Sequence, residues 1–335
     1  MALEGVLFIP YRETLDLLSI EDALEVCEEV YRMHARGTVQ WSRPPSWKLD
    51  VGAPWHNHWH VKGAFLSDVP TTGVRMYNYF DDGITNTVGR LDCARYILLT
   101  DPASGQARAI VEEHWSYAIR SIAAAVIPLK WLGPVKPKVL GLVGVGTMGL
   151  NALHCLRAMY DFEKVVCTSR NPETRNAFAD KWSVELGIDI VPVDDIETVV
   201  RACDIGIGGT TSTDIVARAE WVKPGATYIS LARREMDPAG WGQFDKVVID
   251  DWDANMMNRE FVEFVEKGLF SRDQLHGEIC DVVSENVLGR EQASERILIH
   301  TTGLVSQDIA ICHHIYEKAR SNGVGVSLPP TDGQT

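Results

Sequence analysis

The stretch VLGLVGVGTMGLNALHCL, residues 139–156, decides the fold. A short apolar run is followed by three glycines in GxGxxG spacing and then by a helical pattern. The first glycine of such a fingerprint permits a tight turn, the second lets the backbone approach a pyrophosphate, and the third lets the helix pack closely on the strand. The stretch therefore predicts a dinucleotide site at a helix start, where free N–H groups face the phosphates. The residues that we expect there are Gly144, Gly146, Thr147, Met148 and Gly149.

The next apolar run, KVVCTSRNPETR, indicates which dinucleotide binds. An NAD site usually has an acid at the end of this strand, about 20 residues on, to bind the ribose 2′-hydroxyl. Here the run ends in Ser169 and Arg170, and the nearby acid, Glu163, precedes it. Hydroxyl and guanidinium groups suit a 2′-phosphate, so we expect NADP(H) in preference to NAD(H). Asn171 is a further candidate at the cofactor, although it also has the pattern of a helix N-cap before Pro172.

Short apolar runs alternate with helical patterns after the break GPVKPK. Five such runs are VLGLVGVG, KVVCTS, CDIGIGGT, ATYISLA and KVVIDD. This alternation is the signature of a doubly wound parallel sheet. We therefore predict an α/β fold that contains a Rossmann domain.

The flanking segments predict a second α/β unit. LSIEDALEVCEEVYRMHARG predicts a helix that begins with a capping box of Ser19 and Asp22 and ends at Gly37. Residues 38–110 contain alternating runs such as GVRMYNYF and RYILLTD, which predict an antiparallel sheet. The C-terminal GLVSQDIAICHHIYEKARSNGVG predicts one amphipathic helix that closes at Gly323.

Composition excludes several classes of function. A formal net charge of -14 over 335 residues provides no basic surface for nucleic acid or an anionic membrane. The seven cysteines are scattered without a CxxC pair, which fits a reducing compartment. The sequence has no apolar run of membrane-spanning length, and its first residues lack the features of a signal peptide. We expect a cytoplasmic globular protein of about two domains.

With these residues in view, the chain resembles the ornithine cyclodeaminase/mu-crystallin family over nearly its whole length. The similarity lies in the N-terminal helix, GVRMYNYF, LLTDPASGQARAIVEEHWSYAIRSIAAA, GLVGVGTMG, RACDIGIGGTTS, WVKPGATYISL and TTGLVSQDIAICHHIYEKA. It implies a Rossmann dinucleotide-binding domain, residues 126–303, inserted into a substrate-binding and dimerisation domain made of residues 1–125 and 304–335. It also implies a homodimer. Thr210 and Thr211 are further expected cofactor contacts.

The resemblance implies a nicotinamide-dependent protein and leaves three functions open. The first is an imine reductase or amino-acid dehydrogenase that acts on the C–N bond of a small imino or amino acid. The others are an ornithine cyclodeaminase-type ammonia-lyase with a recycled cofactor and a non-catalytic, crystallin-like NADP(H)-binding protein. Cyclodeaminases have an aspartate after ATYISL, whereas this chain has none between Leu231 and Glu235. The missing aspartate favours the oxidoreductase over the cyclodeaminase. Two interpretations of Glu235 stay open: it matches a later acid of the family, or it is part of a solvated helix start.

The resemblance also implies which residues bind the substrate carboxylate. The family arginine before the small-residue helix matches Arg120, for which the alternative is a structural ion pair with Glu112 or Glu113. The family lysine on the GVK strand is replaced by Arg75. A guanidinium binds a carboxylate bidentately but is a poor proton donor. Arg75 is therefore expected to bind the substrate carboxylate, whereas a role for this residue as general acid is in doubt. Arg43 is the candidate for a further family arginine.

The stretch PWHNHWHVKGAF places His56, His58, His60 and Lys62 at every second position, on one face if the segment is extended. Zinc ligands of standard spacing are missing nearby, so we expect no metal and interpret the strip as polar residues at a substrate pocket. A desolvated lysine can donate the proton that arginine cannot. Lys62 is therefore the expected general acid. His60 is the second candidate, and the alternative is that solvent supplies the proton. The residues expected at the substrate are Arg43, His60, Lys62, Arg75, Arg120 and, in the TTGL turn, Thr302 and Gly303.

Overall fold

The computed structural model describes residues 5–80, 93–210, 212, 214–231 and 235–329. The chain divides into two units, one formed by residues 1–121 with 304–335 and the other by residues 122–303. Helix α3 (His114–Val126) begins in unit 1 and ends in unit 2. The predicted α/β fold is confirmed. The roles expected for the two parts stay predictions at this point.

Unit 1 is built on a mixed sheet whose strands follow the order β16-β1-β7-β6-β5-β4-β2, with β3 also paired to β4. The antiparallel pairing expected between GVRMYNYF and RYILLTD is confirmed as that of β5 with β6. The elements of unit 1 besides α3 are β1 (Val6–Ile9), α1 (Tyr11–Leu17), α2 (Ile20–Arg36), β2 (Val39–Trp41), β3 (Trp47–Val51), β4 (Asn57–Leu66), β5 (Thr71–Phe80), β6 (Arg95–Thr100), β7 (Ala107–Glu112), α11 (Val305–Asn322) and β16 (Val326–Leu328).

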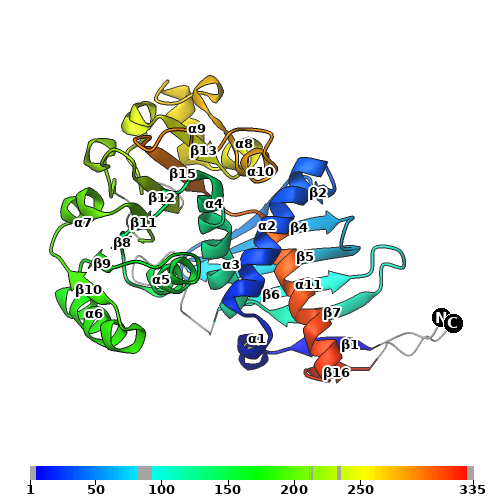
Figure 1. Cartoon of the computed structure of the whole chain (residues 1–335). Coiled ribbons are helices and arrows are strands. Elements are labelled where there is room, and N and C mark those ends of the chain that lie inside the picture. Colours follow the sequence, from blue (N-terminus) through cyan, green and yellow to red (C-terminus); the bar gives the residue numbers. More distant parts are fainter. Residues whose placement is uncertain (1–4, 81–92, 211, 213, 232–234, 330–335) are drawn as a thin grey trace. The chain divides into compact units, whose positions relative to one another are not determined.

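Helices α2 and α11 lie side by side over one face of this sheet (Figure 1). Helix α2 begins as predicted: the Ser19 hydroxyl accepts from the N–H of Asp22, and the Asp22 carboxylate accepts from the N–H of Ser19, both at 3.0 Å. It ends at Gly37, whose φ of 71° favours glycine. The apolar sides of both helices form the core of unit 1: Leu24, Cys27, Val30, Tyr31, Ile309, Ile311, Cys312 and Ile315.

The opposite face of the sheet is apolar and open to solvent. Directly paired residues share a face, and the strand register aligns Trp47, Val61 and Met76 across β3, β4 and β5. Val74 lies opposite Leu98 in the same way. Five apolar side chains on this face are exposed over more than a third of their surface, which is unusual for a sheet: Trp47, Leu49, Val74, Met76 and Leu98.

Unit 2 contains an all-parallel sheet with strand order β10-β9-β8-β11-β12-β15-β13-β14. The order reverses between β8 and β11, and ligands of such sheets bind at the carboxyl ends of the strands at this switch point. The elements are α4 (Leu129–Leu132), β8 (Val139–Val143), α5 (Thr147–Met159), β9 (Lys164–Thr168), α6 (Pro172–Leu186), β10 (Asp189–Pro192), α7 (Ile196–Ala202), β11 (Ile205–Gly208), η2 (Ala219–Trp221), β12 (Thr227–Leu231), η3 (Pro238–Gln243), β13 (Lys246–Ile249), α8 (Trp252–Asn255), α9 (Arg259–Glu266), η4 (Arg272–Gln274), β14 (Gly277–Glu278), α10 (Ile279–Val283) and β15 (Ile297–Thr301).

The sequence pattern predicted five of these strands and missed β10, β14 and β15. Strands β10 and β14 are too short to give a periodic signal. Strand β15 contains the polar His300, which is nevertheless buried against the rings of Trp241 and Phe261. Burial lowers the pKa of His300 to about 4, so the imidazole is neutral and fits an apolar core.

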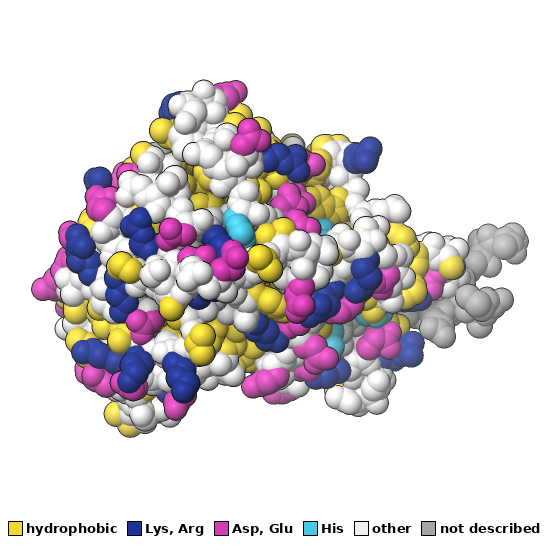
Figure 2. Space-filling view, turned by 45° about the horizontal axis from the view of Figure 1, so that its top comes forward, with side chains coloured by type: hydrophobic (Ala, Val, Ile, Leu, Met, Phe, Trp, Pro, Cys, Tyr) yellow, Lys and Arg dark blue, Asp and Glu magenta, His cyan; other side chains and the backbone are white. Residues whose placement is uncertain are grey.

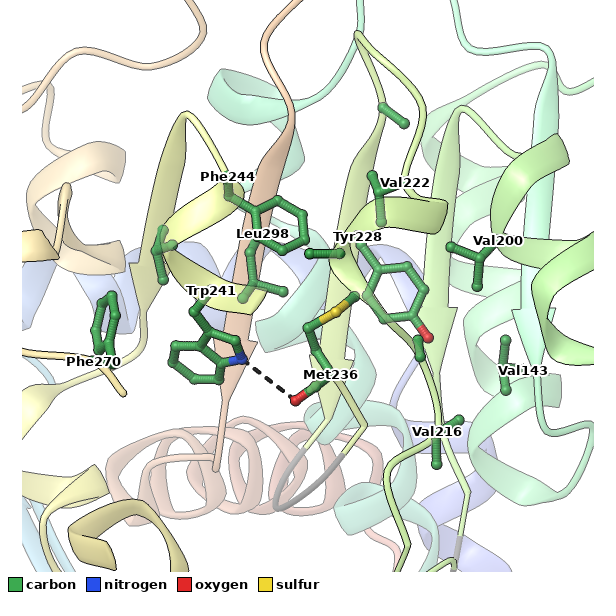
Figure 3. Packing of buried hydrophobic residues seen from close by; sticks show 14 of the residues in the cluster. Val143, Val200, Val216, Val222, Tyr228, Met236, Trp241, Phe244, Phe270 and Leu298 are labelled. Carbon is green, nitrogen blue, oxygen red and sulfur yellow. Dashed lines mark hydrogen bonds between the residues drawn. The ribbon is translucent and has the colours of Figure 1, made fainter. Parts of the chain in front are cut away.

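The core of unit 2 gathers around Tyr228 on β12, Leu298 on β15 and the 3-10 helix η3 (Figure 3). Trp241 is 1% exposed, and its indole N–H donates to the carbonyl oxygen of Met236 at 3.4 Å. This contact attaches the segment after β12 to the core. Truncation of a buried tryptophan to alanine typically costs about 3–5 kcal/mol of stability.

Acidic and basic side chains are interspersed on the face shown in Figure 2. Each of the seven cysteines carries a thiol. Among the described residues, the helices are too short or too polar to cross a membrane.

Candidate active site

The glycine loop lies at the carboxyl end of β8, where the sequence placed it. Gly144 has a φ of 96°, which a side chain would strain, and a Cβ on Gly149 would lie 2.0 Å from the carbonyl oxygen of Gly144. Gly146 differs, because a Cβ there would meet nothing within 4 Å. Gly144 and Gly149 are thus required by the shape of the loop, whereas the space beside Gly146 is open. The exposed Thr147 and the half-buried Met148 follow Gly146 in the chain. This arrangement fits a bound pyrophosphate.

The loop after β11 packs against the glycine loop. A Cβ on Gly144 would lie 2.8 Å from the carbonyl oxygen of Gly209 and 3.4 Å from Cγ2 of Thr210. Thr210 therefore lies beside the expected cofactor site. Thr211, also expected there, lies outside the described residues.

Glu235 holds Thr210 in place. Its Oε1 accepts from the backbone N–H and the hydroxyl of Thr210, at 2.8 and 2.9 Å. Glu235 is 4% exposed, so it is not solvated, although a 3-10 helix does begin at Pro238 with Asp237 as its N-cap. Burial raises the pKa of Glu235 to about 7, although the bonds from Thr210 oppose the shift. The carboxyl group consequently changes charge near neutral pH.

The end of β9 carries the residues expected at the adenosine 2′-phosphate. Ser169 is half-buried and Arg170 is exposed. Arg175, which the sequence analysis did not consider, donates to the carbonyl oxygen of Ser169 at 2.9 Å and pairs with Asp194. This buried guanidinium fixes the loop. Asn171 accepts from the N–H of Glu173 at 2.8 Å and so is confirmed as the N-cap of α6.

Glu163 lies at the other end of β9. It pairs with Lys138 at 2.6 Å, just before the strand begins. An acid at the amino end of a parallel strand is a full strand length from the ligand edge. Glu163 therefore does not take the place of the missing ribose acid.

Unit 1 contains a buried charged cluster around Arg75. Arg75 is 3% exposed, and its Nε–H lies 2.8 Å from both carboxylate oxygens of Glu113. Its Nη1 lies 3.4 Å from Oδ2 of Asp308 on α11. Arg75 is thus held between two buried acids, neither of which the sequence had assigned to it.

Arg120 joins the same cluster from α3. Its Nη2 lies 2.5 Å from Oδ1 of Asp308. The partner is therefore Asp308 rather than Glu112 or Glu113, the two acids considered from the sequence. Among the described residues, Nε of Arg120 and Nη2 of Arg75 are buried without a hydrogen-bond partner.

Arg95 on β6 is a third buried guanidinium, and the sequence analysis missed it. Its Nη1 lies 3.8 Å from Oε1 of Glu113. Within the described part of the chain, its Nε and Nη1 lack hydrogen-bond partners. The guanidinium carbons of Arg75, Arg95 and Arg120 lie 4.9, 4.4 and 5.5 Å from the centre of the Tyr117 ring. Three guanidiniums thus lie within 5.5 Å of the centre of one ring, a distance suited to cation–π attraction.

Lys62 lies directly opposite Arg75 in the β4–β5 register. Burial lowers its pKa to about 8, and Arg75 and Arg120 lower it further, whereas Asp308 raises it. A lysine with a pKa near 8 can release a proton at moderate cost. The position and the pKa both suit the acid that the sequence analysis expected here.

The histidine strip is only partly extended. Strand β4 begins at Asn57, and His56 precedes it with a φ of 48°, so the expected alternation starts at His58. His58 stacks on Tyr79, and its Nδ1–H donates to Oδ1 of Asp50 at 2.6 Å. These contacts place the strip beside tyrosine rings on the sheet.

His60 lies between His58 and Lys62 on β4 and stacks on Tyr77, 5.1 Å away. Burial lowers its pKa to about 4, and Lys48, Lys62 and Arg75 contribute to the shift. The imidazole is neutral at pH 7 and is a poorer proton donor than Lys62. Arg43, in contrast, lies exposed between β2 and β3, outside the buried cluster.

The TTGL turn is fixed within unit 2 by a buried acid. Oδ2 of Asp250 accepts from the backbone N–H groups of Thr302 and Gly303, at 2.8 and 2.7 Å. Gly303 has a φ of 82°, which favours glycine. The turn expected to border the substrate is therefore rigidly placed at the end of β15.

The fold and these sites define a Rossmann-type dinucleotide-binding protein with a second unit that contains a buried cationic cluster. The chain belongs to the ornithine cyclodeaminase/mu-crystallin family, whose model matches residues 9–323.

Two curated relatives and one solved structure illustrate the similarity. Alanine dehydrogenase of Archaeoglobus fulgidus is 26% identical over 335 residues, which cover 96% of this chain and 98% of the relative. Iminosuccinate reductase of Paracoccus denitrificans is 26% identical and covers 95% of this chain and 98% of its own length. An archaeal alanine dehydrogenase, solved as a dimer with bound NAD, superposes with a TM-score of 0.87 at 25% identity, over 97% of this chain and 99% of that one.

Proposed function

We propose that this protein is a nicotinamide-dependent oxidoreductase that acts on the C–N bond of an imino or amino acid. One observation carries the proposal: the guanidiniums of Arg75, Arg95 and Arg120 lie close to the Tyr117 ring and retain buried N–H donors. Buried donors without partners are costly, and a carboxylate satisfies them. The related alanine dehydrogenase and iminosuccinate reductase act, by their names, on an amino acid and an imino acid.

The proposed cofactor site is the glycine loop of unit 2. The open space at Gly146 and the first turn of α5 fit the pyrophosphate. Ser169 and Arg170 at the end of β9 favour NADP(H) over NAD(H). This preference is a proposal for this chain, because the archaeal alanine dehydrogenase structure is described with NAD. The bound dinucleotide supplies the hydride for reduction or accepts it in oxidation.

The proposed substrate site is the cluster of unit 1. Arg120 and Arg75 bind the substrate carboxylate through charge-assisted hydrogen bonds, which fix the orientation of the C–N bond. Asp308 contacts both guanidiniums and Glu113 contacts Arg75, so these two acids are positioning residues. Removing either acid would free a guanidinium to change rotamer and would loosen that orientation.

The proposed acid is Lys62. The imine nitrogen must be protonated, because an iminium carbon is far more electrophilic than the carbon of a neutral imine. Lys62 lies across from Arg75, and its pKa of about 8 allows it to donate near neutral pH. In the oxidative direction the neutral amine of Lys62 takes the proton back.

Absorbance at 340 nm separates this function from its two alternatives. With a panel of cyclic and acyclic imino acids, we expect net consumption of NADPH. Ammonia release without net change in the cofactor would instead support a cyclodeaminase, and tight cofactor binding without turnover would support a non-catalytic binding protein. The oxidoreductase ranks first because the chain has no aspartate between Leu231 and Glu235.

We further propose a homodimer that forms through the open face of the unit 1 sheet. The exposed apolar residues on that face would be covered by the same face of a second copy. The dimeric archaeal alanine dehydrogenase supports this choice of partner. Light scattering on a Met76→Glu variant tests it, since a charge on this face should yield monomers.

A further inference from the structure

The buried cluster of unit 1 has a surplus of positive charge. Arg75 and Arg120 are matched by Glu113 and Asp308, which contact them directly. Two cations remain without an acid of their own among the described residues: the buried Arg95, which shares the Glu113 carboxylate at 3.8 Å, and the partly buried Lys62. A guanidinium does not deprotonate in proteins, and Lys62 is mostly protonated at pH 7. Among the described side chains of the cluster, two positive charges are therefore left over.

The neighbouring polar groups do not offset this surplus. Burial raises the pKa of Tyr77, so its phenol is neutral. His60 is neutral as well, because its pKa is lowered to about 4. Burial also raises the pKa of Glu113, against the effect of Arg75 and Arg95, so the surplus does not decrease. Uncompensated buried charge is unfavourable, and a ligand of net negative charge relieves it.

A monocarboxylic substrate offsets at most one of these two charges. Its carboxylate carries one negative charge while the imine nitrogen is neutral, and this charge is cancelled when the nitrogen is protonated. A second carboxylate on the substrate changes this balance. We infer that the substrate is an imino or amino dicarboxylate, and that Arg95 binds its second carboxylate. This inference rests on the proposed function and names the substrate class of the same site.

The placement of Arg95 suits this role. It lies opposite Tyr77 in the β5–β6 register, and Tyr77 is two residues from Arg75 on β5. Two residues along a strand span about 7 Å, which is the scale of a four- or five-carbon dicarboxylate. The Nε–H of Arg95 is buried and has no hydrogen-bond partner among the described residues, so it can donate a charge-assisted hydrogen bond to a carboxylate, whereas Nη1 lies 3.8 Å from Oε1 of Glu113. Arg120 remains available for the other carboxylate.

The parent protein tests the inference without any substitution. Reductive amination is measured with ammonium, NADPH or NADH, and 2-oxo acids matched in length: 2-oxoglutarate against 2-oxopentanoate, and oxaloacetate against 2-oxobutyrate. We expect kcat/KM to be higher for each dicarboxylate by roughly ten- to hundredfold, the usual effect of one charged hydrogen-bonded pair. Equal or better use of the monocarboxylates overturns the inference while leaving the proposed function intact.

Substitution of Arg95 assigns the effect to this side chain. Arg95→Gln should lower the ratio of the two kcat/KM values by at least about tenfold, and Arg95→Lys should lower it less, because the charge is kept. Arg36→Gln is the matched control: Arg36 is an exposed arginine of the same unit that pairs with Glu29 and Asp68. If Arg95→Gln leaves the ratio of dicarboxylate to monocarboxylate kcat/KM unchanged, Arg95 does not bind the second carboxylate.

Binding measurements separate this inference from the proposed function. Glutarate and pentanoate are titrated against the cofactor-saturated parent by calorimetry. Tighter binding of glutarate, lost in Arg95→Gln, supports the dicarboxylate site even if no 2-oxo acid is turned over, in which case the proposed function fails alone. Equal affinities for the two compounds overturn the inference whatever the turnover.

Discussion

Oδ1 of Asp308 lies 2.5 Å from Nη2 of Arg120, and Oδ2 of the same carboxylate lies 3.4 Å from Nη1 of Arg75. One acid on the C-terminal helix α11 therefore holds two guanidiniums that come from α3 and β5. All three side chains are at most 3% exposed. The cluster is set by contacts between distant parts of the chain, and its integrity is a condition for the proposed carboxylate site.

Arg120→Ala should raise KM and lower kcat/KM by about 100-fold, because one bidentate carboxylate contact is worth roughly 2–3 kcal/mol. Arg120→Lys should recover part of the loss, since it keeps the charge without the fork of donors. Steady-state kinetics of both variants measure the effect, with thermal unfolding to confirm that each is folded. Full activity of Arg120→Ala on every substrate of the parent would remove Arg120 from the site.

Lys62→Met should lower kcat for imine reduction, most strongly at high pH, where solvent protons are scarce. In the parent, reduction should decline as pH rises through about 8, because Lys62 loses its proton there. Oxidation should show the opposite slope. The substitution should also raise the melting temperature at neutral pH, because it removes a desolvated cation. Identical pH–rate profiles for variant and parent would assign the proton to solvent.

Arg170→Asp should shift cofactor preference from NADPH towards NADH, since an aspartate repels a 2′-phosphate and can bind a ribose hydroxyl. The measurement is the ratio of kcat/KM values for the two cofactors. If the parent already prefers NADH, the interpretation of the residues at the end of β9 is wrong.

Two glycine substitutions should separate cofactor binding from stability. In Gly149→Ala the new methyl group would lie 2.0 Å from a backbone oxygen, so helix α5 must shift, and both the melting temperature and the cofactor affinity should fall. In Gly146→Ala the methyl group enters open space; stability should be nearly unchanged, while the dissociation constant for the dinucleotide rises. Fluorescence titration and thermal unfolding measure the pair. Equal loss of stability in both variants would contradict this account of the loop.

Glu235→Gln should change how stability depends on pH. The folded-state pKa of Glu235 is raised to about 7 from 4.5, so the carboxyl contributes stability at low pH that is lost as pH rises from about 4.5 through 7. The variant should lack this loss and be more stable than the parent above pH 7, by of order 1–3 kcal/mol. Chemical unfolding at pH 5 and pH 8 tests the sign. If the parent instead becomes more stable than the variant between pH 5 and pH 8, the folded protein favours the ionised carboxylate of Glu235, and the account is contradicted.

The local structure of the candidate cofactor site was largely predictable from sequence, because it depends on local pattern. The fingerprint glycines, the end of β9 and the N-cap at Asn171 are each determined by residues a few positions apart. The structure of the candidate substrate site was not predictable, because Glu113, Asp308 and Tyr117 meet Arg75 only after the sheet and α11 have packed. Arg95 did leave a signal: in RYILLT it alternates with Ile97 and Leu99, both buried, which marks a charge on a core-facing side.

The central claim, that the buried guanidinium cluster binds the carboxylate of an imino acid, is tested most directly by removing the charge from the substrate instead of the protein. The rate of reduction of an imino acid that the parent turns over is compared with that of its carboxamide, at saturating cofactor. The account predicts that kcat/KM for the acid exceeds that for the amide by about 100-fold, and that Arg120→Ala largely abolishes the difference. Equal rates for acid and amide in the parent would contradict it.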